Sequence, residues 1–470
     1  MIETMQMNKL QDYRATKASK SQNVFERINS VCDEASFVQS LSYLGATGDA
    51  QSIQNTIVCG FGKINGQNIG VVAQNYQDSK GSVDVVSINK AIATVEKATK
   101  SGMPVVFILD SAGMNLDLGV AAMDAYSKLL QTVVRSSGVV PMLGVVAGPC
   151  VGVQGMLAES LDFIIVAGEK AQLGAYSQFV LESAGKFDKE KALRNLGVQF
   201  VTETEEEAFD KVKELLSYLP ANNLQKPFVM EAIENNANDN YKDVEELING
   251  VFDADSVLRL YENTKVFLGF ARLQGQTVAV VSTSGTKGLC IGCCNKIARF
   301  VQTANCFNIP VITFADNNGI LLDTTQEEAG VLRAATRLAF AYGQAVVPMI
   351  SVIVGKAVGT GYVILSSKGI GNDFVFAMPN AIISPLDLDA AIRVNYQDRM
   401  TGVDNIDEVK EELKKEYIEN IASPFEVVKQ GVIDDILLPS ELREKLTQSL
   451  AVIRTKRDSF MPKKHSNMPL

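Results

Sequence analysis

The chain carries the same ordered set of segments twice, with the two copies about 207 residues apart. Four pairs of segments match in order along the sequence: Gly60–Gly66 with Gly269–Gly275, Pro104–Asp110 with Pro310–Asp316, Val139–Met142 with Val346–Met349, and Gly148–Gly152 with Gly355–Gly359. Because the order is kept, duplication of one ancestral domain explains the pattern. A repeat this long predicts two similar domains rather than a solenoid, whose repeats span roughly 20–50 residues.

Within the first copy, apolar runs typical of buried strands alternate with helical segments. The segments 57–63 and 68–74 flank Asn65-Gly66, which predicts a β-hairpin. Buried strands are expected at 104–110, 141–147 and 163–167, and helices at 87–100 and 121–136. This alternation indicates an α/β fold.

The length of 470 residues accommodates two domains of roughly 200 residues each. We expect a helical lead-in over 1–55, a first domain over 56–202, an acidic helical linker over 203–265, and a second domain with a helical tail over 266–470. The acidic run 203–207 is typical of a solvated helix face.

Composition narrows the kinds of partner and compartment. A net charge of -10 and a pI near 5.0 argue against a nucleic-acid partner. The polar N-terminus predicts no secretory signal, and the sequence contains no apolar run of about 18 residues. Seven cysteines without regular spacing predict a reducing compartment, and we expect the cytoplasm.

Metal and histidine chemistry are not expected. Cys290, Cys293 and Cys294 form a CxxCC cluster, but a metal site needs about four ligands, so we interpret them as small packing residues at a helix start. The single histidine, His465, lies in the C-terminal tail, which argues against a Ser-His-Asp or Cys-His arrangement serving two similar domains.

The remaining candidates are two glycine-rich turns and two strand-end aspartates. Each turn, 148–152 and 355–359, lies between an apolar strand and an expected helix, where backbone N–H groups can stabilise an oxyanion. Asp110 and Asp316 each end an apolar strand, where ligands gather in α/β folds. Ordinary turns and Asx-turn capping are the alternative interpretations.

Further segments complete a recognisable ordered set. They are Phe25–Ile28, Ser36–Val38, Ser137–Pro141, Gly148–Cys150, Gly269–Arg272, Phe307–Pro310, Ile312–Phe314, Thr325–Glu327, Ser366–Lys368, and the ending Lys464-His465 to Pro469-Leu470. With this set, residues 24–470 resemble the carboxyltransferase β-subunits of biotin-dependent acyl-CoA carboxylases, such as propionyl-CoA carboxylase. The related subunits of sodium-pumping acyl-CoA decarboxylases are similar too.

The resemblance implies a tandem duplication of two crotonase-like (ClpP/crotonase) domains, each a spiral of ββα units. It implies a backbone oxyanion hole in each domain, formed by Gly152 and Val153 in the first and by Thr360 and Gly361 in the second. One hole would stabilise the enolate of the acyl-CoA thioester, and the other the ureido oxygen of biotin.

The resemblance also implies the cofactors, contacts and partners. Biotin would arrive on a separate carrier, the biotin carboxyl carrier protein, and a coenzyme A thioester would be the substrate. Ala112 and Gly113 in the first domain, and Gly319 and Gly359 in the second, would contact these groups. A biotin carboxylase or a membrane decarboxylase subunit would be a partner. The assembly would be a hexamer in which acyl-CoA on one chain faces carboxybiotin on another.

Several positions depart from the family pattern. The segment 110–115 lacks the arginine that is usual there, Val153 and Thr360 replace glycines, Gly361 replaces an alanine, and 385–389 adds two aspartates. Three functions therefore remain open: an active carboxyltransferase, a non-catalytic structural subunit, or another crotonase-type CoA enzyme. A hydratase would need a carboxylate pair beside the first glycine turn, where the sequence offers only Glu159.

Overall fold

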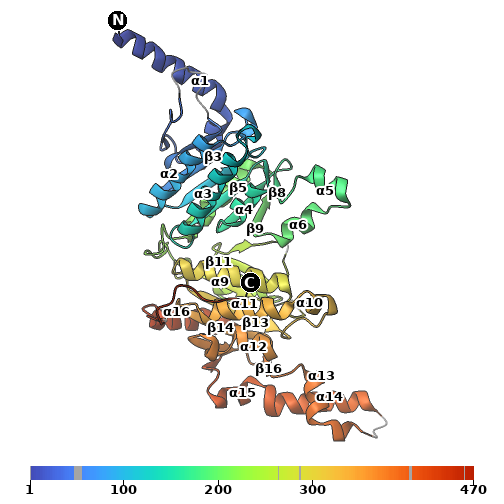
Figure 1. The fold of residues 1–470 in the computed structure, drawn as a ribbon. Coiled ribbons are helices and arrows are strands. Elements are labelled where there is room, and N and C mark those ends of the chain that lie inside the picture. The colour runs from blue at the N-terminus through green and yellow to red at the C-terminus, as the bar shows by residue number, and fades with distance from the viewer. Residues whose placement is uncertain are drawn as a thin grey trace. The chain divides into compact units, whose positions relative to one another are not determined.

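The computed structural model describes residues 2–46, 55–262, 264–284, 287–401, 405–459 and 461–469. The chain divides into two compact units, Met1–Lys226 and Pro227–Leu470, which are described separately (Figure 1).

The first unit is built on a seven-stranded sheet with the order β1-β2-β3-β4-β5-β7-β9. These strands are β1 (Val38–Gln39), β2 (Ile57–Ile64), β3 (Gln67–Gln74), β4 (Val105–Leu109), β5 (Met142–Val146), β7 (Phe163–Ala167) and β9 (Val198–Thr202). A small parallel pair joins β6 (Pro149–Val151) to β8 (Gln172–Gly174). The helices are α1 (Ile2–Val31), α2 (Val85–Lys100), α3 (Val120–Ser136), α4 (Val153–Glu159), α5 (Gln178–Ala184), α6 (Lys189–Asn195) and α7 (Glu205–Tyr218).

The second unit repeats this plan with the order β10-β11-β12-β13-β14-β15-β17, and β16 pairs with the end of β14. The strands are β10 (Leu258–Leu260), β11 (Phe267–Leu273), β12 (Gln276–Ser282), β13 (Val311–Asn317), β14 (Met349–Val358), β15 (Phe374–Ala377), β16 (Ile382–Ser384) and β17 (Asp435–Ile436). The helices are α8 (Val244–Val251), α9 (Ile291–Cys306), α10 (Thr324–Glu328), α11 (Val331–Gly343), α12 (Gly359–Leu365), α13 (Leu388–Asn395), α14 (Ile406–Tyr417), α15 (Pro424–Val427) and α16 (Leu442–Ile453).

Strand pairing confirms the duplication at the level of register. In the first sheet Gln39 pairs with Gly60, and in the second Arg259 pairs with Gly269, the glycine that repeats Gly60. In both sheets an antiparallel hairpin leads into parallel strands. The ββα unit expected of a crotonase-like domain is therefore present as β2-β3-α2 and again as β11-β12-α9.

The hairpin turns show that the repeat begins before residues 56 and 266. Asp33 accepts hydrogen bonds from the N–H groups of Asn65 and Gly66 at 2.9 and 2.8 Å. Asp253 accepts the equivalent bonds from Gln274 and Gly275 at 3.1 and 2.7 Å. The range expected to be a linker, 203–265, thus contains β10 and a carboxylate that fixes the turn after β11.

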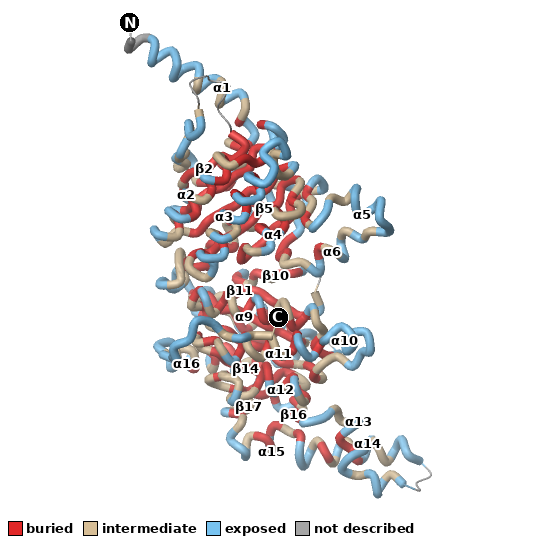
Figure 2. Tube along the Cα trace, in the orientation of Figure 1, coloured by how far each residue is buried: buried red, intermediate tan, exposed pale blue. Residues whose placement is uncertain are grey.

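The central strands of each sheet are buried along most of their length, which explains their continuous apolar sequences (Figure 2). In the first unit α2 and α3 pack together beside the sheet, and α7 packs against β7 and β9. In the second unit α9 and α11 pack together, while α8 and α16 contribute to a separate buried cluster against the sheet. Among the described residues, no helix combines the length and apolar character needed to span a bilayer.

Candidate active site

In the first unit the glycine turn changes the chain direction between a short strand and a helix. The chain leaves β6 at Val151, passes through Gly152 with φ 65° and ψ −129°, and enters α4. This backbone conformation favours glycine because a Cβ atom would be strained at positive φ. Gly152 is therefore required at the position that orients the first turn of α4.

The two N–H donors expected in this turn have different surroundings. The Gly152 N–H donates to the carbonyl of Gly174 at 3.0 Å, so a ligand would have to compete with this bond. Val153 begins α4, and the first-turn N–H groups of a helix have no intrahelical acceptor. Of the two expected donors, the Val153 N–H is therefore the one whose direction is set by the start of α4.

In the second unit the equivalent turn follows β14 directly. Gly359 has φ 51°, and α12 begins at this residue, so Thr360 and Gly361 both lie in its first turn. A Cβ atom on Gly361 would overlap the side-chain oxygen of Asn317. Asn317 is buried, and its side-chain oxygen accepts the Gly319 N–H at 3.0 Å. The space beside Gly361 is therefore filled by the end of β13 and by Gly319 in the loop that follows it.

The loops carrying the other candidate residues are also equivalent. The Val83 N–H donates to the Gly113 carbonyl at 3.0 Å, and the Leu289 N–H donates to the Gly319 carbonyl at 2.8 Å. Both glycines have positive φ, 118° and 86°. The Ala112 N–H is engaged with the Lys80 carbonyl at 2.9 Å.

The second unit brings its four candidate residues together. A Cβ atom built on Gly319 would lie 3.1 Å from the Val358 carbonyl oxygen and 3.6 Å from the Thr360 hydroxyl. Gly319, Gly359, Thr360 and Gly361 therefore lie around one turn. In the first unit, the loop after β4 contacts the segment of the glycine turn through one hydrogen bond, in which the Ser111 N–H donates to the Pro149 carbonyl at 3.0 Å.

A cavity of 450 Å³ opens beside the glycine turn of the second unit. Its lining is largely apolar and includes Gly359, Tyr362, Val363, Ile383 and Pro385. Partial burial raises the pKa of Tyr362, so its hydroxyl stays protonated at neutral pH. The cavity can hold an apolar ligand whose polar end meets the first turn of α12.

The two added aspartates near this cavity have structural partners. The Asp387 carboxylate caps α13 by accepting the Asp389 N–H at 3.0 Å. The hydrogen bond from Lys414 lowers the pKa of Asp389, and the two groups form an ion pair at 2.9 Å. Of the segment 385–389, only Pro385 lines the cavity.

The strand-end aspartates lie against the first glycine of each turn. A Cβ atom on Gly148 would overlap the Asp110 carboxylate, and one on Gly355 would overlap the Asp316 carboxylate. Asp316 accepts hydrogen bonds from the Lys356 N–H at 2.8 Å and from the Ser284 hydroxyl at 3.0 Å. The Asp316 carboxylate therefore holds its turn by a hydrogen bond, whereas the Asp110 carboxylate lies next to Gly148 and pairs with Arg27.

Sequence reasoning missed Arg27, which joins α1 to the strand-end Asp110 and to Glu205 on α7. Its guanidinium contacts the Asp110 carboxylate at 2.7 Å and forms two hydrogen bonds to Glu205 at 2.7 and 2.6 Å. Burial alone would lower the pKa of Arg27, but the hydrogen bonds to Glu205 and Asp110 raise it. The sequence signal was an arginine within the family-like segment 25–28, although its partner Glu205 lies 178 residues away.

Replacing Arg27 with methionine is expected to destabilise the first unit by about 1–3 kcal/mol, because hydrogen bonds to charged groups are lost and the buried Asp110 is left unpaired. Thermal denaturation followed by circular dichroism measures the effect. Lys213→Met is the control, since its pair with Asp210 is exposed and its loss should cost no more than about 0.5 kcal/mol. Equal melting temperatures for Arg27→Met and the parent protein would contradict this role.

Two titratable groups near the first turn, the Cys150 thiol and the Tyr126 hydroxyl, stay protonated at neutral pH because burial raises the pKa of each. The pKa of the Cys150 thiol is raised to about 12. Glu159 lies at the opposite end of α4 from Gly152, where its carboxylate accepts the Gly197 N–H at 3.1 Å. Among the described residues, no group of three or more histidine, cysteine, aspartate or glutamate side chains is arranged to hold a metal ion. Both glycine turns lead into a helix, and the first-turn N–H groups of a helix have no intrahelical acceptor.

Comparison with known proteins agrees with this duplicated architecture. Residues 17–468 match the model of the carboxyl transferase domain family. The propionyl-CoA carboxylase carboxyltransferase subunit of Haloferax mediterranei is 31% identical over 445 residues, covering 88% of this chain and 86% of that protein. A biotin-dependent acetyl-/propionyl-coenzyme A carboxylase beta5 subunit of Mycobacterium tuberculosis is 30% identical, covering 95% of this chain and 89% of that protein.

Solved structures give the same result. Transcarboxylase 12S, described as a hexamer with methylmalonyl-coenzyme A bound, matches with a TM-score of 0.89 and 27% identity, covering 100% of this chain and 98% of that one. A single-chain long-chain acyl-CoA carboxylase, at 20% identity and a TM-score of 0.79, shares the fold. The chain therefore belongs to the carboxyl transferase family, as a carboxyltransferase of the kind found in biotin-dependent acyl-CoA carboxylases.

Proposed function

We propose that the chain transfers CO2 between carboxybiotin on a carrier protein and the α-carbon of a short acyl-CoA. The observation that carries this proposal is the repeated arrangement of a positive-φ glycine at the first turn of a helix, once in each unit. Two carbonyl oxygens, one on each reactant, gain negative charge in such a transfer and need stabilisation, and each unit offers one set of backbone donors.

In this proposal the two turns have different ligands. The turn at Gly152 and Val153 polarises the thioester carbonyl and stabilises the enolate. Ala112 and Gly113 follow Ser111, whose N–H donates to the Pro149 carbonyl near this turn. The first turn of α12, with Thr360 and Gly361, donates to the ureido oxygen of biotin, with Gly319 and Gly359 around it. Since the donors are backbone groups, a valine or threonine at these positions still supplies an N–H.

The second unit fits the biotin role better than the acyl-CoA role. Biotin supplies a CO2 group that it can release, and its ring system and chain are largely apolar apart from the ureido group. The 450 Å³ cavity beside Gly359 has largely apolar walls, and Gly359, the first residue of α12, is part of its lining. Asp387 and Asp389, engaged in a helix cap and an ion pair, do not line this cavity.

Assembly into a homohexamer is part of the proposal, with a biotin carboxyl carrier protein and a biotin carboxylase or membrane decarboxylase subunit as partners. The first unit of one chain would then complete the site with the second unit of another. Static light scattering at micromolar concentration should give about six times the mass of one 50.9 kDa chain. A stable monomer would remove the composite site.

The reaction itself is tested with purified protein, carboxylated biotin carrier and a panel of short acyl-CoAs, beginning with acetyl-CoA and propionyl-CoA. Carboxylated acyl-CoA, detected by mass spectrometry, is the expected product, and the reverse reaction should release CO2 to biotin. If no acyl-CoA is carboxylated and calorimetry detects no CoA binding, the chain is a structural subunit of the complex instead.

A further inference from the structure

The three clustered cysteines at the start of α9 form a feature that carboxyl transfer does not use. Cys290 precedes the helix as its N-cap, and its sulfur accepts the Cys293 N–H at 3.2 Å. The Cys290 and Cys293 sulfurs lie 2.7 Å apart and share a hydrogen bond. Residues three apart at a helix start lie on the same face, so this proximity follows directly from the Cys-x-x-Cys spacing.

The two sulfurs differ in protonation. The hydrogen bond from the Cys293 thiol, joined by backbone N–H groups of the first helical turn, lowers the pKa of Cys290 to about 6. The same hydrogen bond, together with burial, raises the pKa of Cys293. A thiolate at Cys290 beside a thiol at Cys293 is the arrangement that thiol–disulfide exchange requires, because only the thiolate is a nucleophile.

The solvent exposure of the three cysteines determines the order in which they react with an external reagent. Cys290 is half-buried, Cys293 is 6% exposed, and Cys294 is fully buried. An external reagent therefore reaches Cys290 first, and Cys293 can attack only from inside. The buried Cys32, Cys59 and Cys150 differ, since burial raises their pKa values to about 11, 12 and 12.

We propose that Cys290 and Cys293 are a reversible dithiol–disulfide site that exchanges with low-molecular-weight disulfides. The Cys290 thiolate attacks one sulfur of the reagent, a mixed disulfide forms, and the first small thiolate leaves and takes up a proton. Cys293 then loses its proton to solvent and attacks the Cys290 sulfur, which expels the second small thiolate. Two electrons pass from the protein dithiol to the reagent, and an excess of a small thiol reverses both steps.

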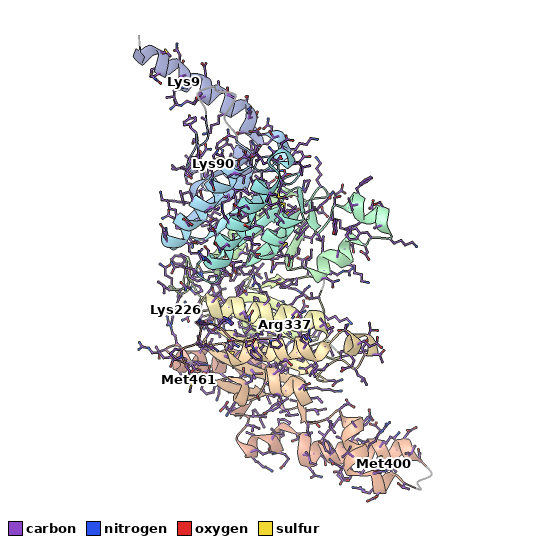
Figure 3. The ribbon with its side chains drawn as sticks, in the orientation of Figure 1. Lys9, Lys90, Lys226, Arg337, Met400 and Met461 are labelled. Atoms are coloured by element: carbon purple, nitrogen blue, oxygen red, sulfur yellow. The ribbon has the colours of Figure 1, made fainter. Side chains whose placement is uncertain are left out.

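The site adjoins the loop that holds Gly319. Leu289, the residue before Cys290, donates its N–H to the Gly319 carbonyl at 2.8 Å and accepts the Leu321 N–H at 3.1 Å. Behind it α9 packs on α11, where Arg337, labelled in Figure 3, donates to the Asn295 side chain at 2.5 Å. A disulfide at Cys290 would thus form next to Leu289, the residue that is hydrogen-bonded to the loop holding Gly319.

Glutathione disulfide is the probe for a test on the full-length protein, read by intact mass and peptide mapping after iodoacetamide treatment. Before alkylation, the intact mass of the parent protein should fall by two hydrogens. After alkylation, peptide mapping should yield a peptide with a Cys290–Cys293 disulfide. Cys293→Ser should stop at the first step and keep one glutathione on Cys290. Cys290→Ser should form neither product, and serine keeps the helix cap.

Cys306→Ser is the matched control, because Cys306 is an exposed cysteine in the last turn of the same helix. It should form the Cys290–Cys293 disulfide as fully as the parent protein. The proposal is overturned if the parent keeps both thiols while Cys306 is glutathionylated, or if Cys290→Ser is oxidised to the same extent. Circular dichroism of each variant establishes that the fold is retained, and the mass readout does not depend on carboxyl transfer.

Discussion

Replacing Gly361 with alanine is expected to reduce carboxyl transfer by about 100-fold or more. The added Cβ atom would overlap the Asn317 side-chain oxygen, so either Asn317 releases the Gly319 N–H or the first turn of α12 moves. Either response displaces the Thr360 and Gly361 donors, and a displacement of about 1 Å can cost roughly 100-fold in rate. Steady-state kinetics with carboxylated biotin carrier measures the loss.

Gly343→Ala is the control for this substitution. Gly343 ends α11 in the same unit, and a Cβ atom there would make only ordinary contacts, the nearest at 3.8 Å to Ile370. It should retain the parent rate. If Gly361→Ala folds normally and also keeps the parent rate, the turn of α12 is not the donor site and the placement of biotin in the second unit is wrong.

Replacing Asp253 with alanine is expected to destabilise the second unit by roughly 3–5 kcal/mol. Asp253 is 1% exposed, contacts the Arg443 guanidinium at 2.6 Å, and accepts both N–H groups of the turn after β11. Without this carboxylate, Arg443 is a buried cation that keeps only carbonyl partners such as Val251. Urea denaturation followed by circular dichroism measures the free energy of unfolding.

The duplication supplies a matched control in Asp33→Ala. Asp33 makes the same two turn contacts in the first unit, but it is partly exposed and the structure shows no arginine bound to it among the described residues. Its loss should cost only about 1–2 kcal/mol. Equal costs for the two substitutions would show that the turn contacts, and not the buried ion pair, dominate at Asp253.

Local patterns in the sequence were sufficient to predict several of the repeated strands and turns. Asn65-Gly66 marked the first hairpin turn, where both residues have positive φ, and the apolar run 163–167 matches β7 residue for residue. Gly152 and Gly359 marked two turns that adopt positive φ. These features follow from short-range sterics and burial, so neighbouring residues alone determine them.

Segments whose structure depends on distant partners were harder to predict. The strand β10 lies in a polar range interpreted as a linker, because its identity as a strand depends on pairing with β11. The small sheet of β6 and β8 joins three-residue strands that carry no periodic signal. Strands this short form through tertiary hydrogen bonding and not through propensity.

The sequence by itself determined the duplication, the α/β class and the family, because order, spacing and hydrophobic periodicity are written along the chain. Only the tertiary structure decided that Arg27 joins Asp110 to Glu205, that Gly361 faces Asn317, and that Cys290 lies one residue from the Gly319 contact. The physical reason is that these contacts join residues far apart in sequence. Their geometry is set by packing of the whole unit, and no local pattern encodes it.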